Sequence, residues 1–370
     1  MKKIGIITMI SNNYGNRLQN YALQEYLNKK GVNAETINNA FYNTIKRKLN
    51  IFSIPLKVIN RLKFLYLGKK YKNIEDSRCK SFKQYNDKYI HFAAQSINTE
   101  SDISTINNLY DKFIVGSDQV WNPHANRNKL LDFLSFSPRE KNITYAVSFG
   151  VDNLDACFYD EYKKGMENFS HISVREYEGK KIIYELTGRD DVQVLIDPTM
   201  LLTKEEWESI EQKPKNYGDL KGKKYILSYF LGSLSKQRNQ EIKRIAKEND
   251  CEIIEILNKD SAFYACNPSE FLYLERNAFL ICTDSFHSCV FGILFKTPFI
   301  VYKREDDITS MFSRISNLLC KFNLETRCYN GQITNNLLGC EYSHTDKILE
   351  EERKKAKCFI EKALEIEENE

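Results

Sequence analysis

The chain has 370 residues, of which 42% are hydrophobic and 28% are charged, and its formal net charge is +4. One hydrophobic core rarely grows beyond about 250–300 residues, so this length predicts two domains of ordinary globular composition. The small net charge argues against a nucleic-acid-binding protein, and no stretch approaches the roughly 20 apolar residues of a membrane-spanning helix.

The chain opens with a strand, a helix and a second strand. Lys3–Thr8 is rich in isoleucine and predicts a strand, which the glycine-containing turn at 12–16 connects to a helix. Apolar residues recur on one helical face over Arg17–Lys30, and Gly31 ends that helix. Val32–Ile37 then predicts a strand, so these elements form a βαβ unit.

The same alternation continues along the chain. In the first half, the other expected strands are Phe113–Gly116, Ile143–Phe149, His171–Val174 and Val192–Ile196, with a helix at Glu178–Leu186. In the second half, the expected strands are Tyr225–Phe230, Glu252–Leu257, Phe279–Thr283 and Phe299–Tyr302, and the expected helices are Arg238–Glu248, Pro268–Asn277, Ser285–Phe295 and Lys347–Ile366. Strands that alternate with amphipathic helices are typical of parallel α/β sheets.

This pattern predicts an α/β fold in which two Rossmann-like domains face a cleft. We expect the first domain at residues 1–205, with a helical basic insertion at about 41–98, and the second at residues 206–345. Residues 346–370 are expected to form a C-terminal helix that packs back on the first domain.

Residues 44–90 are strongly basic, with thirteen Lys and Arg against three acidic residues and a local net charge of +10. One interpretation is a solvated helical face. The other is a surface for an anionic partner, either a membrane leaflet or a lipid-diphosphate carrier. The aromatic residues in this segment follow helical core spacing without a recognition motif, so no nucleic acid is expected.

Location and cofactors are predicted from what the sequence lacks. Ile4–Ile10 is too short for the apolar region of a signal peptide, so we expect a cytoplasmic protein, with peripheral contact at the inner face of the membrane through residues 44–90. The ten cysteines are scattered, which favours free thiols. The sequence has no cluster of Cys and His residues, so no metal site is expected. No GxGxxG, P-loop, HExxH or GxSxG motif is present, so no cofactor is expected.

Polar residues follow six of the expected strands. Ligands of doubly wound folds bind at the carboxyl ends of strands, so these residues predict one substrate-binding crevice. The candidates are Asn13, Gly15, Asn16, Ser117, Asp118, Gln119, Ser148, Arg175, Asp197, Asp284, Ser285 and His287. Asp118 and Asp197 could act as bases or orient partners, although capping of a turn is the commoner role.

His287 and Arg175 are the strongest catalytic candidates. His287 lies in the first turn of a predicted helix, where free backbone N–H groups attract anions. It could transfer a proton or bind a phosphate or carboxylate there, and the alternative is a histidine that only caps or packs. Arg175 can hold such an anion with two hydrogen bonds, and the alternative is a salt bridge to Glu176 or Asp197.

Several strings occur in the order found in one known family. They are NYGNRLQNYALQ (13–24), VGSDQVWNP (115–123), YAVSFG (145–150), SVRE (173–176), IDPTMLL (196–202), PSEFL (268–272), TDSFHSCVFGILF (283–295) and SRISNLLCKFNLETR (313–327). In this ordered set the chain resembles the polysaccharide pyruvyl transferase family. The resemblance implies a GT-B-like fold, phosphoenolpyruvate as donor and a sugar of a surface polysaccharide or its lipid-linked precursor as acceptor.

The resemblance also assigns roles to residues. Arg175 matches an arginine that the family uses for the donor, and His287 matches the histidine of an Arg-apolar-His string. Ser285 stands where that string has its arginine, so Arg304 or Arg314 is expected to supply the missing cation. The product would be a pyruvate ketal that bridges two sugar hydroxyls, formed with His287 as acid and base and without a metal.

Two other functions fit the same pattern. A nucleotide-sugar glycosyltransferase is compatible with the fold, and Asp284 or Glu305 could then bind the base and ribose. A binding protein without catalysis is the third possibility, because the Arg-apolar-His string lacks its arginine. Titration with phosphoenolpyruvate against UDP and GDP sugars would separate the three.

Overall fold

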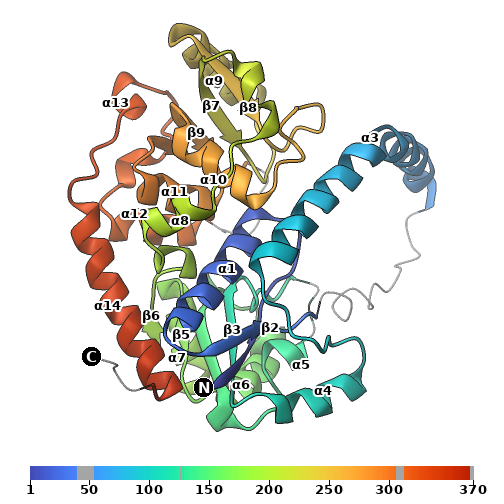
Figure 1. Cartoon of the computed structure of the whole chain (residues 1–370), viewed down its shortest axis with the longest axis vertical. Helices are drawn as coiled ribbons and strands as arrows, with labels where there is room; N and C mark the ends of the chain where they lie inside the picture. Colours follow the sequence, from blue (N-terminus) through green and yellow to red (C-terminus); the bar gives the residue numbers. More distant parts are fainter. Residues whose placement is uncertain (40–53, 126, 128, 306–311, 367–370) are drawn as a thin grey trace.

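Two parallel β-sheets form the framework of the molecule (Figure 1). The computed structural model describes residues 1–39, 54–125, 127, 129–305 and 312–366, with the backbone alone at 54–70 and 100. Every strand predicted from the sequence is present, with ends shifted by one or two residues. Alternation of apolar strands with amphipathic helices was therefore a sufficient signal for the sheets.

The first sheet has six strands in the order β2-β1-β3-β4-β5-β6. All of its pairings are parallel, and β1 lies between β2 and β3. The strands are β1 (Lys3–Ile7), β2 (Asn33–Thr36), β3 (Lys112–Asp118), β4 (Asn142–Val147), β5 (Ser173–Val174) and β6 (Gln193–Val194).

The second sheet has four strands in the order β10-β9-β7-β8, again all parallel. The strands are β7 (Lys224–Tyr229), β8 (Cys251–Glu255), β9 (Leu280–Thr283) and β10 (Phe299–Val301). In both sheets the strand order reverses beside the first strand, between β1 and β3 and between β7 and β9. Parallel sheets bind ligands at such reversals, so each half offers one candidate binding position, at the carboxyl ends of these neighbouring strands.

The helices cover the sheets and connect them. The predicted helices are present as α1 (Tyr14–Lys29), α7 (Tyr177–Thr187), α9 (Lys236–Glu248), α10 (Pro268–Asn277), α11 (Phe286–Phe295) and α14 (Thr345–Leu364). The helical insertion contributes α3 (Ile54–Tyr89). Further helices that sequence reasoning did not place are α4 (Glu100–Ile106), α5 (Lys129–Asp132), α6 (Tyr159–Glu167), α8 (Lys204–Ile210), α12 (Ser313–Lys321) and α13 (Asn335–Leu338).

The last helix, α14, returns from the second sheet to the first (Figure 1). Phe359 packs against the rings of Tyr145 and His171, which belong to the first half. Lys112 donates to the carbonyl oxygen of Ala363, at the end of the helix where its dipole is negative (3.1 Å). These contacts attach the end of the chain to the first sheet.

The structure describes only part of the basic segment 44–90. Residues 44–53 lie outside the described part of the chain, and α3 carries the remainder. Phe82 and Tyr85 are buried, as their helical spacing predicted. Arg78, which the sequence groups with a basic surface, is instead 6% exposed and contacts the second half. The pairing partner of this arginine lies far away in the chain, so charge counting could not reveal it.

A buried carboxyl group lies between α10 and α11. Glu275 is 0% exposed, and its Oε1 accepts a hydrogen bond from the Ser288 hydroxyl (2.5 Å). Burial raises the pKa of Glu275 well above its ordinary value, against the smaller opposing effect of that hydrogen bond. The folded protein therefore keeps a proton on Glu275 that the unfolded chain releases above about pH 4.3.

We expect Glu275→Gln to make stability less dependent on pH. With a folded pKa above the unfolded one, the wild type loses stability as pH rises from about 4.3 towards the folded pKa, by up to about 1.4 kcal/mol per pH unit. The glutamine does not titrate, so the free energy of unfolding of the variant should rise relative to that of the wild type between pH 5 and pH 8. Urea denaturation midpoints at the two pH values measure this, and parallel midpoints would contradict it.

Candidate active site

The two candidate binding positions face each other where α1 begins after β1 and where α11 begins after β9. Gly15 lies in the first turn of α1, and a Cβ atom built on it would collide with the imidazole ring of His287 in α11. Only glycine permits this approach at position 15. The side chain of Asn13 caps α1 by accepting from the Asn16 backbone N–H (3.2 Å). The sequence-predicted turn and histidine are therefore neighbours across the two halves.

Asp197 is the centre of the polar cluster and is 1% exposed. Its Oδ2 accepts from Arg175 Nη1 (2.7 Å) and from the Ser117 hydroxyl (3.2 Å). His287 Nε2 lies 3.6 Å from the same oxygen, and Thr199 donates to Oδ1. Burial alone would raise the pKa of Asp197, but His287, Arg175 and Thr199 outweigh it, and the pKa lies below its ordinary value.

Asp118 is a second buried carboxylate beside the first. It accepts from the Asn16 side-chain amide, and its Oδ1 lies 3.5 Å from Arg175 Nη2. Burial again opposes ionisation, yet His287, Arg175 and Arg314 together lower the pKa of Asp118. Two carboxylates thus face two guanidinium groups and one imidazole, all of them largely buried.

Two arginines of this cluster keep unused donors. Among the described residues, the Nε atoms of Arg175 and Arg314 have no hydrogen-bond partner, although both side chains are buried. The Arg175 guanidinium stacks on the Phe286 ring at 4.2 Å. Burial, together with repulsion from Arg175, lowers the pKa of Arg314 to about 10. Two buried guanidinium groups with free donors are what a bound anion requires.

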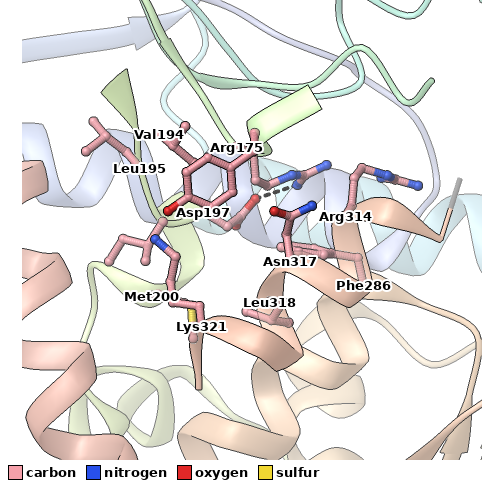
Figure 2. Close-up of a pocket in the computed structure, with 12 residues that line it drawn as sticks. Arg175, Val194, Leu195, Asp197, Met200, Phe286, Arg314, Asn317, Leu318 and Lys321 are labelled. Atoms are coloured by element: carbon pink, nitrogen blue, oxygen red, sulfur yellow. Dashed lines mark hydrogen bonds and ion pairs between the residues drawn. The ribbon is translucent and has the colours of Figure 1, made fainter. Parts of the chain in front are cut away.

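A pocket opens onto the two arginines (Figure 2). Asp197 and Arg314 lie at the polar end of the pocket, and Figure 2 shows Arg175 linked to Asp197 beside the guanidinium of Arg314. Asn317 and Lys321 of α12 add polar groups. The apolar wall is made by Val194, Leu195, Ile196, Met200, Phe286 and Leu318. The anion site is therefore joined to an apolar surface.

The remaining predicted residues lie around this cluster. The Ser148 hydroxyl donates to the buried carboxylate Glu176 (2.7 Å). Gln119 faces Arg314, in the amide orientation whose oxygen accepts from both terminal nitrogens at 2.6 and 2.7 Å. Ser285 occupies the N-cap position of α11, and its side chain makes no capping hydrogen bond.

Asp284 and Arg304 form a separate contact in the second half. Asp284 accepts from the backbone N–H groups of Leu231 and Gly232 (2.7 and 2.8 Å) and from Arg304 Nε (3.0 Å). The carboxylate thus ties the loop after β7 to the loop after β9. Of the two cations that sequence reasoning named as substitutes for the arginine missing at 285, Arg314 is the one beside Arg175.

Sequence reasoning missed Arg17, a buried arginine whose charge interacts with that of Asp118. Arg17 is 0% exposed, donates to the Met9 carbonyl, and leaves Nε and Nη1 without partners among the described residues. Burial lowers its pKa to about 10, against the attraction of Tyr85 and Asp118. The string NRLQN (16–20) is mostly polar, so hydrophobic patterning gave no signal that this arginine is buried.

The described residues contain neither a membrane-spanning helix nor a group of metal ligands. No helix in the described ranges is long and apolar enough to cross a bilayer. No group of three or more His, Cys, Asp or Glu side chains in that part of the chain has the spacing of a metal site.

A family model described as polysaccharide pyruvyl transferase matches residues 13–306, which is most of the chain. The chain belongs to the polysaccharide pyruvyl transferase family. The matched range includes the α1 turn, Asp118, Arg175, Asp197 and His287, and it ends before α12. A search of curated protein sequences found no match to this member of the family.

Solved structures show the fold that this family member has. A UDP-N-acetylglucosamine 2-epimerase superposes with a TM-score of 0.53 at 11% identity, over 98% of this chain and 95% of that one. A structure described by the same activity from Listeria monocytogenes superposes with a TM-score of 0.51 at 12% identity, over 96% of this chain and 91% of that one. Another from Rickettsia bellii superposes with a TM-score of 0.50 at 12% identity, over 99% of this chain and 96% of that one. At these identities the likeness shows the fold alone, which is GT-B-like, as predicted.

Proposed function

We propose that this protein transfers the pyruvyl group of phosphoenolpyruvate to a sugar of a surface polysaccharide or its lipid-linked precursor, and forms a pyruvate ketal. The observation that supports this most is the pair of buried arginines, Arg175 and Arg314, near His287 and Asp197. Their Nε donors have no hydrogen-bond partner in the part of the chain that the structure describes. Phosphoenolpyruvate is small and carries a carboxylate and a phosphate, so it needs several fixed cationic donors.

The helix N-terminus supplies a second attraction for the donor. The first backbone N–H groups of α11 have no intrahelical acceptor, and the dipole of this ten-residue helix favours an anion at that end. His287 lies in the same turn. A donor bound between α11 and Arg175 would therefore place its C2 and C3 atoms near the imidazole.

The proposed chemistry needs proton transfer but no redox step. One sugar hydroxyl adds to C2 of the donor while a proton reaches C3, which changes the methylene into a methyl group. The C–O bond to phosphate then breaks, and a second sugar hydroxyl attacks C2 and loses its proton. One hydroxyl proton ends on C3 and the other leaves with phosphate, so His287, which faces Asp197, can carry protons in both steps.

The acceptor side is proposed on charge. A sugar carried on a lipid diphosphate is anionic, and residues 44–90 have a local net charge of +10. We propose that this segment favours such an acceptor and permits peripheral contact with the inner face of the membrane. The cytoplasm, where phosphoenolpyruvate is made, is the proposed location.

Arg314→Met is expected to weaken phosphoenolpyruvate binding by about 10- to 100-fold, because a hydrogen bond to a charged group contributes about 1.5–3 kcal/mol. Isothermal titration calorimetry measures the dissociation constant, and phosphate release in the presence of candidate acceptors measures turnover. Arg244→Met, which removes an exposed arginine paired within α9, is the matched control. Unchanged donor affinity in Arg314→Met would contradict the donor site.

The alternative function is a nucleotide-sugar glycosyltransferase. The fold is compatible with it, because the solved structures that superpose on this chain are named for a nucleotide sugar, UDP-N-acetylglucosamine. The same calorimetry with UDP and GDP sugars distinguishes the two. Binding of a nucleotide sugar without binding of phosphoenolpyruvate would favour the alternative.

A further inference from the structure

The inference concerns α3, whose N-terminal end projects away from both sheets (Figure 1) and whose later part contacts the second half of the chain at residues 259–264. Its Arg78 is 6% exposed, although it belongs to the basic segment. Arg78 Nη1 donates to the Tyr264 carbonyl (2.6 Å) and to the Tyr14 hydroxyl (2.9 Å), and Nη2 donates to the Asn12 carbonyl (3.3 Å). One guanidinium therefore joins three segments that are remote in sequence.

Aromatic rings surround that guanidinium. Its central carbon lies 4.8 Å from the ring centroids of Tyr14 and Phe82 and 5.0 Å from that of Tyr264. A cation enclosed by three rings and three acceptors is held in one place. Glu75, one turn earlier on α3, pairs with Lys259 and accepts from the Tyr264 hydroxyl. We call the contact of Glu75 and Arg78 with residues 259–264 the α3 clasp.

Tyr14 connects the α3 clasp to the active site. Its hydroxyl donates to the Cys266 carbonyl (2.9 Å), and its ring stacks on Phe271 of the second half at 4.3 Å. The next residue in the chain is Gly15, on which the His287 ring rests. Asn16 then binds Asp118 in the first half. The turn held by Arg78 thus contacts His287 on one side and the carboxylate cluster on the other.

We propose that Arg78 is a positioning residue for His287. By holding Asn12 and Tyr14 against the second half, it fixes the Gly15 surface that sets the orientation of the imidazole towards Asp197. Arg78 itself does not line the pocket at Arg175, so it acts through the α1 turn. Its kinetic consequence rests on the proposed pyruvyl transfer, whereas its effect on the His287 ring does not.

The kinetic test uses Arg78→Met. We expect kcat for phosphate release from phosphoenolpyruvate to fall by at least about tenfold, while the dissociation constant of the donor changes less than about twofold, because a small misplacement of a catalytic group is costly. Arg244→Met, which removes an exposed arginine of α9 outside the basic segment, is the control and should behave as the wild type.

A double-mutant cycle separates positioning from general destabilisation. If Arg78 acts through His287, adding Arg78→Met to His287→Gln should reduce kcat by less than about twofold further. Gly15→Ala should reproduce the loss of turnover without altering α3, because the added methyl group displaces the imidazole. An equal loss from Arg78→Met in both backgrounds, or wild-type turnover in either single variant, would overturn the proposal.

A third measurement needs no substrate. NMR of the histidine side chains, with the His287 signal assigned from His287→Gln, should show a shifted ring resonance in Arg78→Met and an unchanged one in Arg244→Met. Hydrogen exchange in residues 259–266 should rise in Arg78→Met as the clasp loosens. If the protein does not turn over phosphoenolpyruvate, the proposed function fails, and the His287 resonance still decides the positioning role. An unmoved resonance would refute that role.

Discussion

His287→Gln is expected to lower kcat for pyruvyl transfer by about 10²-fold or more, with the protein still folded. Glutamine keeps a hydrogen-bond donor near Asp197 but cannot exchange protons at neutral pH. His287→Ala should be slightly more impaired, because it also leaves a cavity against Gly15 and removes a partner of Asp197. Single-turnover phosphate release measures the chemical step directly.

The control and the contrary result are both specific. His124→Gln removes an exposed histidine outside the cluster and should leave kcat unchanged. If His287→Gln instead keeps most of the turnover, His287 only binds the anion, and the proton comes from another group. Asp118, Asp197 and Asp284 are then the carboxyl groups to replace next.

Asp197→Asn is expected to have the largest effect on stability, with a loss of about 3–5 kcal/mol in the free energy of unfolding, because it leaves the buried guanidinium of Arg175 without its counter-charge. Asp197 is 1% exposed, and it faces both Arg175 and His287. Turnover should fall as well, since the imidazole loses the group towards which it is oriented. Urea denaturation at pH 7 measures the stability, with the exposed Asp346→Asn as control.

The pH dependence of that difference has a definite sign. The folded pKa of Asp197 lies below its unfolded value of about 3.9, so its stabilisation is present above that pH and is lost as pH falls towards the folded pKa. Wild type and Asp197→Asn should therefore differ most near neutral pH and converge in acid. A difference that stays constant down to pH 3 would show that the carboxylate charge is not the cause.

The sequence predicted the sheets and the central site residues for physical reasons. Short runs rich in isoleucine and valine and bounded by turn residues favour buried strands, and polar residues that follow parallel strands lie at the same end of the sheet. Asn16, Asp118, Arg175, Asp197 and His287 were all named by that rule, and the structure brings them together.

What the sequence could not give is contact between remote side chains. Nothing near Arg78 in the chain distinguishes it from the other basic residues of α3, because its acceptors at 12, 14 and 264 belong to other elements. The α12 helix was missed because Phe312 at its start gives no capping signal. Arg314 could be named as a substitute cation, but its place beside Arg175 depends on the packing of that helix.

The return of α14 to the first sheet means that the chain passes between the two halves twice. One passage leads from β6 to β7, and the other leads from the second sheet to α14, where Arg353 donates to the carbonyls of Met200 and Leu202 beside the first passage. The hydrogen bonds of Arg353 hold these two passages side by side, so the second half of the molecule is attached to the first by two adjacent lengths of chain and not by one.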